Sequence, residues 1–321
     1  MKEWMIWQSG RLDQLLAQEL NISRSQVLGC IKAGLVSMDG KICQKGGVEV
    51  KPGSYVCVQE PPAVEITPLP TTLNIECLYE DEDLLVINKP PHLAVHPAPS
   101  LKEESLVDYL VAKGYQLSNL NGTSRCGIVH RLDKDTSGAL VIAKNNACHA
   151  HLSAQLQSRQ MGRYYVALIQ GHLREPLFVE CHLGRHPKNR LKRANLDALK
   201  VKGGKPSKTF FVPLFDGLKC QLVGARLYSG RTHQVRAHLE SLGRPILGDR
   251  LYGAKEGSAK RTMLHAYILY LIHPRTGHQH LFKAELLKDM VECAQSHLQG
   301  NNWYGCLQEA SFLERFSTLF V

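Results

Sequence analysis

Residues 130–138 hold the densest set of reactive side chains in this sequence, in the order His-Arg-Leu-Asp-Lys-Asp-Thr-Ser-Gly. Asp133 stands two positions after Arg131 and directly after a leucine. The small polar residues that follow it are typical of turns. A carboxylate in this setting could bind a metal ion, accept a phosphoryl group or attack the sugar of a nucleoside. It could also belong to a solvated turn, and the segment alone does not separate these possibilities.

Two of the possibilities make demands that the sequence does not meet. A calcium-binding EF-hand loop starting at Asp133 needs a glutamate at its twelfth position, where this chain has Lys144. A phosphatase of the haloacid dehalogenase type would place Asp133 and Asp135 after a buried apolar strand. The residues before Asp133 include His130 and Arg131, which do not suit such a strand. We therefore disfavour both interpretations, and we expect Asp135 to be a turn residue.

The segment 130–138 matches the HRLDxxTSG signature of the RluA-type pseudouridine synthases, and other segments resemble motifs of that family in the same order. These segments are residues 80–91 and 95–97, 163–167, 230–238, 243–249, 264–266 and 273–277. The resemblance covers about residues 75–290. It implies an enzyme that isomerises uridine to pseudouridine in RNA, needs no cofactor or metal, and has its active site in a cleft across a sheet.

The resemblance also suggests three catalytic residues. Asp133 would be the essential aspartate, either attacking the sugar or deprotonating it to begin an elimination, and the sequence leaves both routes open. Tyr165 would hold the uracil ring and assist proton transfer, with Tyr164 as the alternative on the opposite face of a strand. An arginine close to a carboxylate favours its ionised form. Arg236 is our candidate for that partner, with Arg231 as the runner-up.

Several neighbouring residues are given supporting roles. Arg131 is expected to fill the gap that the extruded nucleotide leaves, which lowers the unstacking cost of a few kcal/mol. Thr232 is expected to cap a helix over residues 232–242 that is stopped by Gly243 and holds Arg236 on a rigid element. Arg163 stands where the family more often has a lysine. Three histidines of the motifs are expected to be structural: His130, His233 and His238.

The positive charge of the chain indicates RNA as its partner. The formal net charge is +10, and residues 185–208 contain nine Lys or Arg against the single acid Asp197. A cationic segment of this kind releases counterions when it contacts phosphates, so its binding depends steeply on salt. The residues predicted to contact RNA in the catalytic part are Arg131, Arg231, Lys188, Arg190, Lys192 and Arg193.

Residues 1–60 are predicted to form a separate small RNA-binding domain. Four leucines over residues 12–20 mark one face of a helix, and a second helix is expected after Ser23. Asp39-Gly40 is a strong hairpin turn between two short strands. The pattern resembles the module named for ribosomal protein S4, which implies that three basic residues face RNA phosphates: Arg11, Arg24 and Lys32.

The rest of the chain is divided into a proline-rich linker (61–74), a catalytic domain (75–290) and a helical tail (291–321). Strands are predicted at 84–87, 164–169, 209–215 and 220–228, and helices at about 105–112, 146–159 and 232–242. No βαβ periodicity or glycine-rich phosphate loop is present. These patterns favour an α+β fold in which a mixed, largely antiparallel sheet carries the site.

The composition also indicates where the protein acts and which kinds of site it lacks. No stretch approaches the roughly 18 apolar residues of a membrane span, and the N-terminus does not resemble a signal peptide. Ten cysteines without a CxxC pair are expected to be reduced, and the histidines lack a metal-binding spacing. We expect a cytoplasmic monomer that acts on large-subunit (23S) ribosomal RNA or a pre-ribosomal particle, because residues 184–188 and 204–208 resemble the RluD branch. The alternatives are a pseudouridine synthase acting on tRNA and a non-catalytic RNA-binding or ribosome-assembly factor.

Overall fold

The computed structural model describes residues 2–20, 22, 24–59, 73–97, 103–255, 257–298 and 300–317. Ser23 and most of the predicted linker lie outside these residues. The N-terminal unit has two helices, α1 (Leu12–Glu19) and α2 (Arg24–Lys32). They accompany a sheet of strands β1 (Lys2–Met5), β6 (Tyr55–Val58), β3 (Val36–Met38) and β4 (Lys41–Ile42), and a strand pair β2 (Gly10–Arg11) and β5 (Glu49–Val50).

The predicted hairpin of this unit is confirmed. Strands β3 and β4 pair antiparallel, with Ser37 opposite Ile42. Asp39 and Gly40 both have positive φ angles, of 50° and 76°. This left-handed geometry at both central residues gives the turn a twist that matches the strands, which is why an Asp-Gly pair is found there.

The larger unit is built on a ten-stranded sheet in the order β12-β11-β13-β14-β10-β15-β9-β8-β7, with β16 also paired to β15. Its neighbouring strands pair antiparallel except β9 and β15, which are parallel. The strands are β7 (Glu76–Glu80), β8 (Leu84–Lys89), β9 (Ser137–Ala143), β10 (Gly162–Gln170), β11 (Leu177–Arg185), β12 (Arg193–Asn195), β13 (Lys205–Asp216), β14 (Cys220–Leu227), β15 (Leu264–Ile272) and β16 (Gln279–Lys283). The predicted α+β class with a mixed, largely antiparallel sheet is confirmed.

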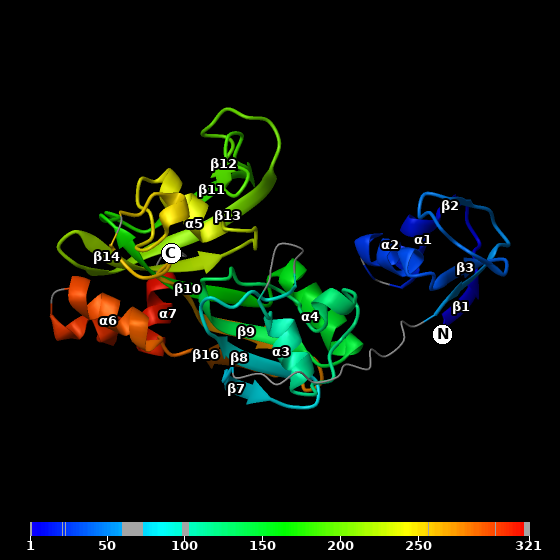
Figure 1. The fold of residues 1–321 in the computed structure, drawn as a ribbon, viewed down its shortest axis with the longest axis horizontal. Helices are drawn as coiled ribbons and strands as arrows, with labels where there is room; N and C mark the ends of the chain where they lie inside the picture. Colours follow the sequence, from blue (N-terminus) through cyan, green and yellow to red (C-terminus); the bar gives the residue numbers. More distant parts are fainter. Residues whose placement is uncertain are drawn as a thin grey trace.

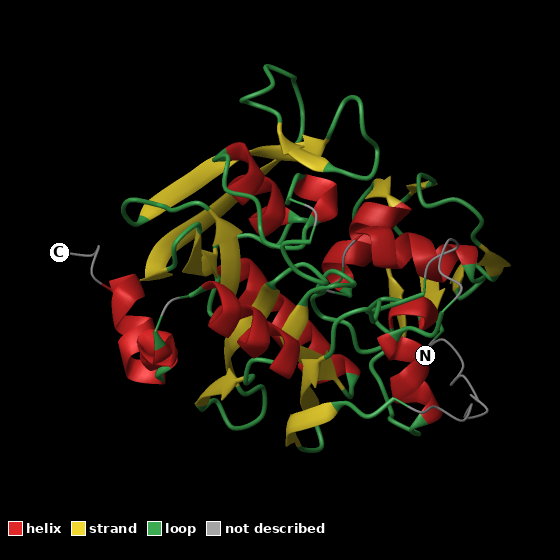
Figure 2. Cartoon of the chain, turned by 60° about the vertical axis from the view of Figure 1, so that its left-hand side comes forward, coloured by secondary structure: helices red, strands yellow, loops and turns green. Residues whose placement is uncertain are grey.

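Helices cover this sheet in separate groups (Figure 1). Helix α4 packs against β9 and β15, whereas α5 packs against β12 and β13. The loops around β12 protrude from the sheet in both views (Figures 1 and 2), and they carry the basic segment. The helices are α3 (Leu106–Ala112), α4 (Asn146–Ser158), α5 (Gln234–Ser241), α6 (Lys288–His297) and α7 (Glu309–Ser317), with short 3-10 turns η1 (Thr123–Arg125), η2 (Arg250–Tyr252) and η3 (Asn301–Leu307).

The C-terminal helices belong to the main hydrophobic core. Phe312 and Phe316 are buried, and the ring of Phe316 meets that of Tyr164 edge-on at 4.8 Å. Trp303 on η3 is buried in the same core. The helical tail that the sequence set apart therefore shares the core of the catalytic sheet. None of the described helices is long and apolar enough to cross a membrane.

Three buried histidines make the fold sensitive to acid. His149, His238 and His265 are 1% exposed or less, and burial lowers the pKa of each imidazole to about 4. An unfolded histidine titrates near pH 6.5, so between about pH 6.5 and pH 4 the unfolded chain binds more protons than the folded chain. The free energy of unfolding should therefore fall as the pH drops through this window, by up to about 1.4 kcal/mol per pH unit for each histidine.

Urea unfolding followed by circular dichroism at about pH 7.5 and pH 5 measures this loss. His149→Gln removes one of the titrating groups, so the dependence of its unfolding free energy on pH should be shallower than that of the unaltered protein. Equal unfolding free energies at the two pH values would contradict the prediction.

Candidate active site

Asp133 lies in a turn that leads directly into β9. The backbone N–H of Thr136 donates to the Asp133 carbonyl at 3.1 Å, and the strand begins at the next residue, Ser137. Gly138 has a φ of 112°, and a Cβ there would lie 2.3 Å from the Ala266 carbonyl oxygen. A glycine is therefore required where β9 meets β15. The phosphatase interpretation needed a buried strand directly before Asp133. In the structure the strand, β9, follows Asp133 instead.

Arg236 joins Asp133 to a second, deeper carboxylate. One terminal nitrogen of its guanidinium group donates to Asp133 Oδ2 at 3.0 Å. The opposite edge of the group binds both oxygens of Asp249, at 2.6 and 2.9 Å. Burial opposes the charge of Arg236, but hydrogen bonds and attraction from the two carboxylates raise its pKa above the usual range. The arginine therefore stays charged and fixes the carboxylate of Asp133 in one position.

Helix α5 presents Arg236 but begins differently from the prediction. Its N-cap is His233, in the left-handed conformation, and no side chain caps it. The expected cap by Thr232 is therefore wrong. The Gln234 side chain fixes the start of the helix instead. Its oxygen accepts from the N–H of Arg231 at 3.0 Å, and its amide group donates to the Lys208 carbonyl at 3.0 Å. These bonds tie the start of the helix to β13.

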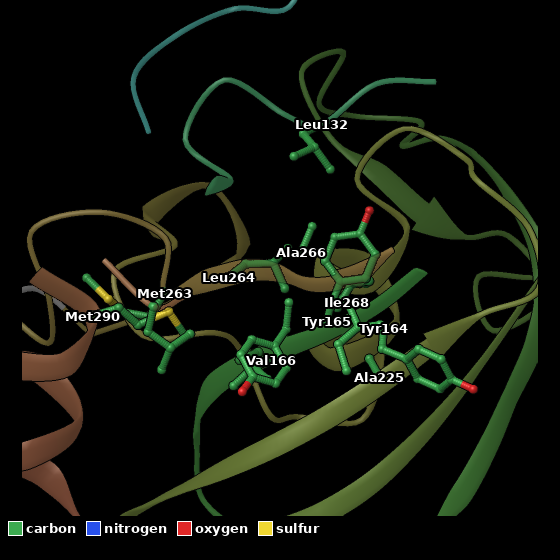
Figure 3. Close-up of a cluster of buried hydrophobic side chains, with 14 of the residues drawn as sticks. Leu132, Tyr164, Tyr165, Val166, Ala225, Met263, Leu264, Ala266, Ile268 and Met290 are labelled. Atoms are coloured by element: carbon green, nitrogen blue, oxygen red, sulfur yellow. The ribbon is translucent and has the colours of Figure 1, made fainter. Parts of the chain in front are cut away.

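Tyr165 lines the same small cavity as Asp133 and Arg236, which has a volume of about 50 Å³. Figure 3 shows its ring on the side of Leu132, whereas Tyr164 points the other way. Tyr165 is 4% exposed, and burial raises the pKa of its phenol. The hydroxyl is therefore protonated at neutral pH. Tyr164 packs on the C-terminal helix α7. It lines neither this cavity nor a larger one beside it.

His233 and Tyr252 complete the surroundings of the aspartate; the sequence analysis expected His233 to be structural and did not single out Tyr252. His233 Nε2 lies 3.9 Å from Asp133 Oδ2, and its Nδ1 lies 3.1 Å from the Tyr252 hydroxyl. That hydroxyl also accepts from the N–H of Arg193 at 2.8 Å. Burial lowers the pKa of His233. The imidazole beside Asp133 is therefore neutral at neutral pH.

Lys89 holds the turn on its other side. The side chain is fully buried, and its Nζ donates to the carbonyls of Pro90, Leu93 and Lys134 at 2.7, 2.9 and 3.1 Å. Burial lowers the pKa of this lysine to about 7. Because Lys134 directly follows Asp133, the lysine connects the end of β8 to the reactive turn and positions it.

Arg163 is a further buried cation that the sequence identified only as a replacement for lysine. It is 7% exposed, and its Nε has no hydrogen-bond partner among the described residues. It lines the cavity of Asp133 and also a larger neighbouring cavity. A Cβ at Gly230 would lie 3.1 Å from its guanidinium group, so Gly230 leaves room for this side chain.

Two arginines predicted to contact RNA lie at the mouth of the site. Arg131 is exposed and lines both cavities. Arg231 is exposed and lines the cavity of Asp133, but its Nε donates to the Pro206 carbonyl at 3.2 Å. The partner of Asp133 is therefore Arg236, and Arg231 is placed to face a ligand from the rim.

The four basic residues predicted on the β11–β12 segment have different surroundings. Lys188 and Arg190 are exposed. Lys192 instead pairs with Glu240 at 3.0 Å, and Arg193 is partly buried on β12. Lys188 and Arg190 are thus the two whose side chains lie open to solvent.

In the N-terminal unit, Arg11 and Arg24 share one carboxylate. Their guanidinium groups lie 3.1 and 2.7 Å from Asp13 Oδ2, and each side chain is about half exposed, at 48% and 49%. Hydrogen bonds from the two arginines lower the pKa of Asp13 to about 2. Lys32 is exposed at the end of α2. All three predicted cations therefore reach solvent, two of them held in place by Asp13.

One cluster has side chains of the type that binds metals. Asp81, Asp83 and His273 offer oxygen and nitrogen atoms within 4.8 Å of one another. His273 Nδ1 accepts from the backbone N–H groups of Arg275 and Thr276, so Nε2 carries the proton that is donated to Asp81 at 2.6 Å. Arg275 binds both oxygens of Asp83. Protein hydrogen bonds account for this cluster, and we assign no metal to it.

Comparisons with known proteins agree with this geometry. Residues 83–241 match the family model of RNA pseudouridylate synthases, and residues 10–55 match that of the S4 domain. A protein of Helicobacter pylori named as an uncharacterized RNA pseudouridine synthase is 49% identical over 315 residues, which is 95% of both chains. A ribosomal large subunit pseudouridine synthase D of Zymomonas mobilis is 36% identical, over 87% of this chain and 91% of its own.

A solved structure shows the same similarity in three dimensions. The structure titled human RNA pseudouridylate synthase domain containing 1 aligns with a TM-score of 0.58 and 26% identity. The alignment covers 78% of this chain and 98% of the human chain.

Proposed function

Because the chain belongs to the RNA pseudouridylate synthase family, we propose that it converts specific uridines of large-subunit ribosomal RNA to pseudouridine, with Asp133 as the essential residue. The observation that carries this proposal is the contact of Asp133 with Arg236 in a cavity that Tyr165 also lines. Support for the ribosomal target comes from relatives named ribosomal large subunit pseudouridine synthase D, and the S4 domain supports RNA as the substrate.

The reaction exchanges one bond of the base for another. The bond between C1′ of the ribose and N1 of uracil breaks, a bond from C1′ to C5 forms, C5 loses its proton and N1 gains one. No electron acceptor or water is consumed. Asp133 would start the exchange, either by attacking C1′ or by removing the proton from C2′. Arg236 would hold the carboxylate in position, and the neutral phenol of Tyr165 would contact the uracil and help to transfer the proton.

Delivery of the uridine requires that the base leave its stack. Arg131 is exposed at the mouth of the cavity. Its planar guanidinium group can take the place of the extruded base and so offset part of the few kcal/mol that unstacking costs. The same position would orient the strand for entry of its target nucleotide.

The direct test is to incubate the protein with transcribed 23S ribosomal RNA and with tRNA, and to map pseudouridine chemically at single-nucleotide resolution. We expect product at discrete uridines of the ribosomal RNA. Product confined to tRNA would replace the proposed target. Salt-sensitive binding without product in either RNA would favour a non-catalytic assembly factor.

Lys188→Gln combined with Arg190→Gln should weaken RNA binding and flatten its dependence on salt. Both side chains are exposed. Each phosphate contact that is lost should reduce the slope of log affinity against log salt by about 0.7 to 0.9. Filter binding across a salt series measures this slope. Lys192→Gln is the matched control, because Lys192 is paired with Glu240 and should change the slope less; an unchanged slope in the double variant would show that this loop does not contact phosphate.

A further inference from the structure

A second, larger cavity adjoins the cavity of Asp133. Its volume is about 420 Å³, within the range of roughly 300 to 1,000 Å³ that is common for small-ligand sites. Arg131, Arg163, Leu227 and Gly230 line both cavities, whereas Asp133 and Tyr165 do not line the larger one. A group bound in this space would therefore lie beside the cavity of Asp133 and share four of its lining residues.

The charged side chains that line the larger cavity are cationic. Among the described residues, no aspartate or glutamate lines it, and five arginines do: Arg125, Arg131, Arg159, Arg163 and Arg226. Within the described part of the chain, none of these arginines forms an ion pair with a carboxylate. So many cations without a carboxylate partner around one cavity favour an anion, and guanidinium groups match the geometry of phosphate oxygens.

Two residues that line this cavity also have a buried donor without a partner in the described part of the chain. Arg163 Nε is one of them. His130 is 7% exposed, and its Nε2 accepts from the N–H of Val141 at 3.3 Å. The proton of the neutral ring is therefore on Nδ1, which has no partner among the described residues. Buried donors are nearly always bonded in folded proteins, so the wall of this cavity contains two donors that the described residues leave unsatisfied.

The wall formed by β14 adds flat surfaces to the charge. The Arg226 guanidinium lies over the ring of Tyr228 at 5.1 Å, and Tyr270 also borders the cavity. Arg226, Tyr228 and Tyr270 are each only partly buried. Bases of single-stranded RNA stack on tyrosine rings and on guanidinium planes. Phosphate-binding and base-stacking groups are thus combined in one space.

We propose that this cavity binds the nucleotide adjoining the target uridine, with its phosphate held by the arginines and its base against Arg226 and Tyr228. The inference rests on the proposed function, because it takes RNA as the substrate. It gives the enzyme a second point of recognition beside the reacting base. The nature of the neighbouring nucleotide would then influence which uridines are accepted.

The test is a double-mutant cycle between the cavity and individual RNA phosphates. The variant is Arg125→Gln combined with Arg159→Asn; both arginines are exposed, and asparagine tolerates the left-handed backbone of Arg159, whose φ is 63°. Arg174→Gln is the matched control, because Arg174 is exposed and lines neither cavity. The RNA is a short segment that the protein protects from nuclease, synthesised with a neutral methylphosphonate at one position at a time.

We expect one methylphosphonate to weaken binding by about tenfold for the unaltered protein and for Arg174→Gln, but by less than about twofold for the double variant. Equal losses in all three proteins at every position would overturn the inference. Competition by inorganic phosphate that the double variant abolishes, without coupling to any RNA phosphate, would also overturn it and assign the cavity to a free anion. The cycle measures binding alone, so an absence of pseudouridine would count against the proposed function and not against this site.

Discussion

Asp133→Asn should form pseudouridine at least about a thousandfold more slowly than the unaltered protein, while its affinity for RNA stays within about threefold. Asparagine has the same shape, and its side-chain oxygen can still accept the hydrogen bond from Arg236 that Asp133 accepts at 3.0 Å. The fold of the site should therefore persist. The amide can neither attack the sugar nor remove a proton from it, so both possible routes are blocked.

The matched control for this variant is Asp135→Asn, in the same turn. Asp135 is about half exposed, and its carboxylate contacts His92 at 2.9 Å; it lines neither cavity. Single-turnover assays with chemical mapping should show near-normal product from Asp135→Asn. Undiminished product from Asp133→Asn, or an equal loss in both variants, would contradict the assignment of Asp133 as the reacting carboxylate.

Features with local causes were predictable from the sequence. The Asp39-Gly40 hairpin follows from the backbone preferences of two adjacent residues. The strand predicted at 164–169 lies inside β10 (Gly162–Gln170). Alternation along that strand also separated Tyr165 from Tyr164 correctly, since the two rings point to opposite sides (Figure 3).

Features that depend on distant contacts were not predictable in the same way. The start of β9 could not be recognised from the sequence, because its first residues are of types that also form turns. Gly138 is a glycine because the strand approaches Ala266 closely there, and not because the chain forms a loop. Asp249 follows Arg236 by 13 residues, yet it is the carboxylate that fixes the arginine. The cap expected at Thr232 failed because the side chain of Gln234 bonds the helix start to β13. In each case a tertiary contact outweighed a local preference.

Arg236→Met should destabilise the protein by about 3 to 5 kcal/mol and also remove most of its activity. Asp249 is 1% exposed, and the loss of both hydrogen bonds from Arg236 would leave its charge buried without a counter-charge. Methionine has a long, flexible side chain that can fill the vacated space, so the cost comes mainly from the unpaired carboxylate. Urea unfolding near pH 7.5 measures the change in the free energy of unfolding.

A second variant separates stability from catalysis. Arg236→Met combined with Asp249→Asn removes the buried charge along with its partner, so most of the lost stability should return. The amide oxygen of the asparagine can still accept from the N–H of Tyr252, as Asp249 does at 3.3 Å. Activity should stay low, because Asp133 still lacks the hydrogen bond that fixes its carboxylate. Recovery of both stability and activity in the double variant would show that Arg236 serves only to neutralise Asp249 and does not position Asp133.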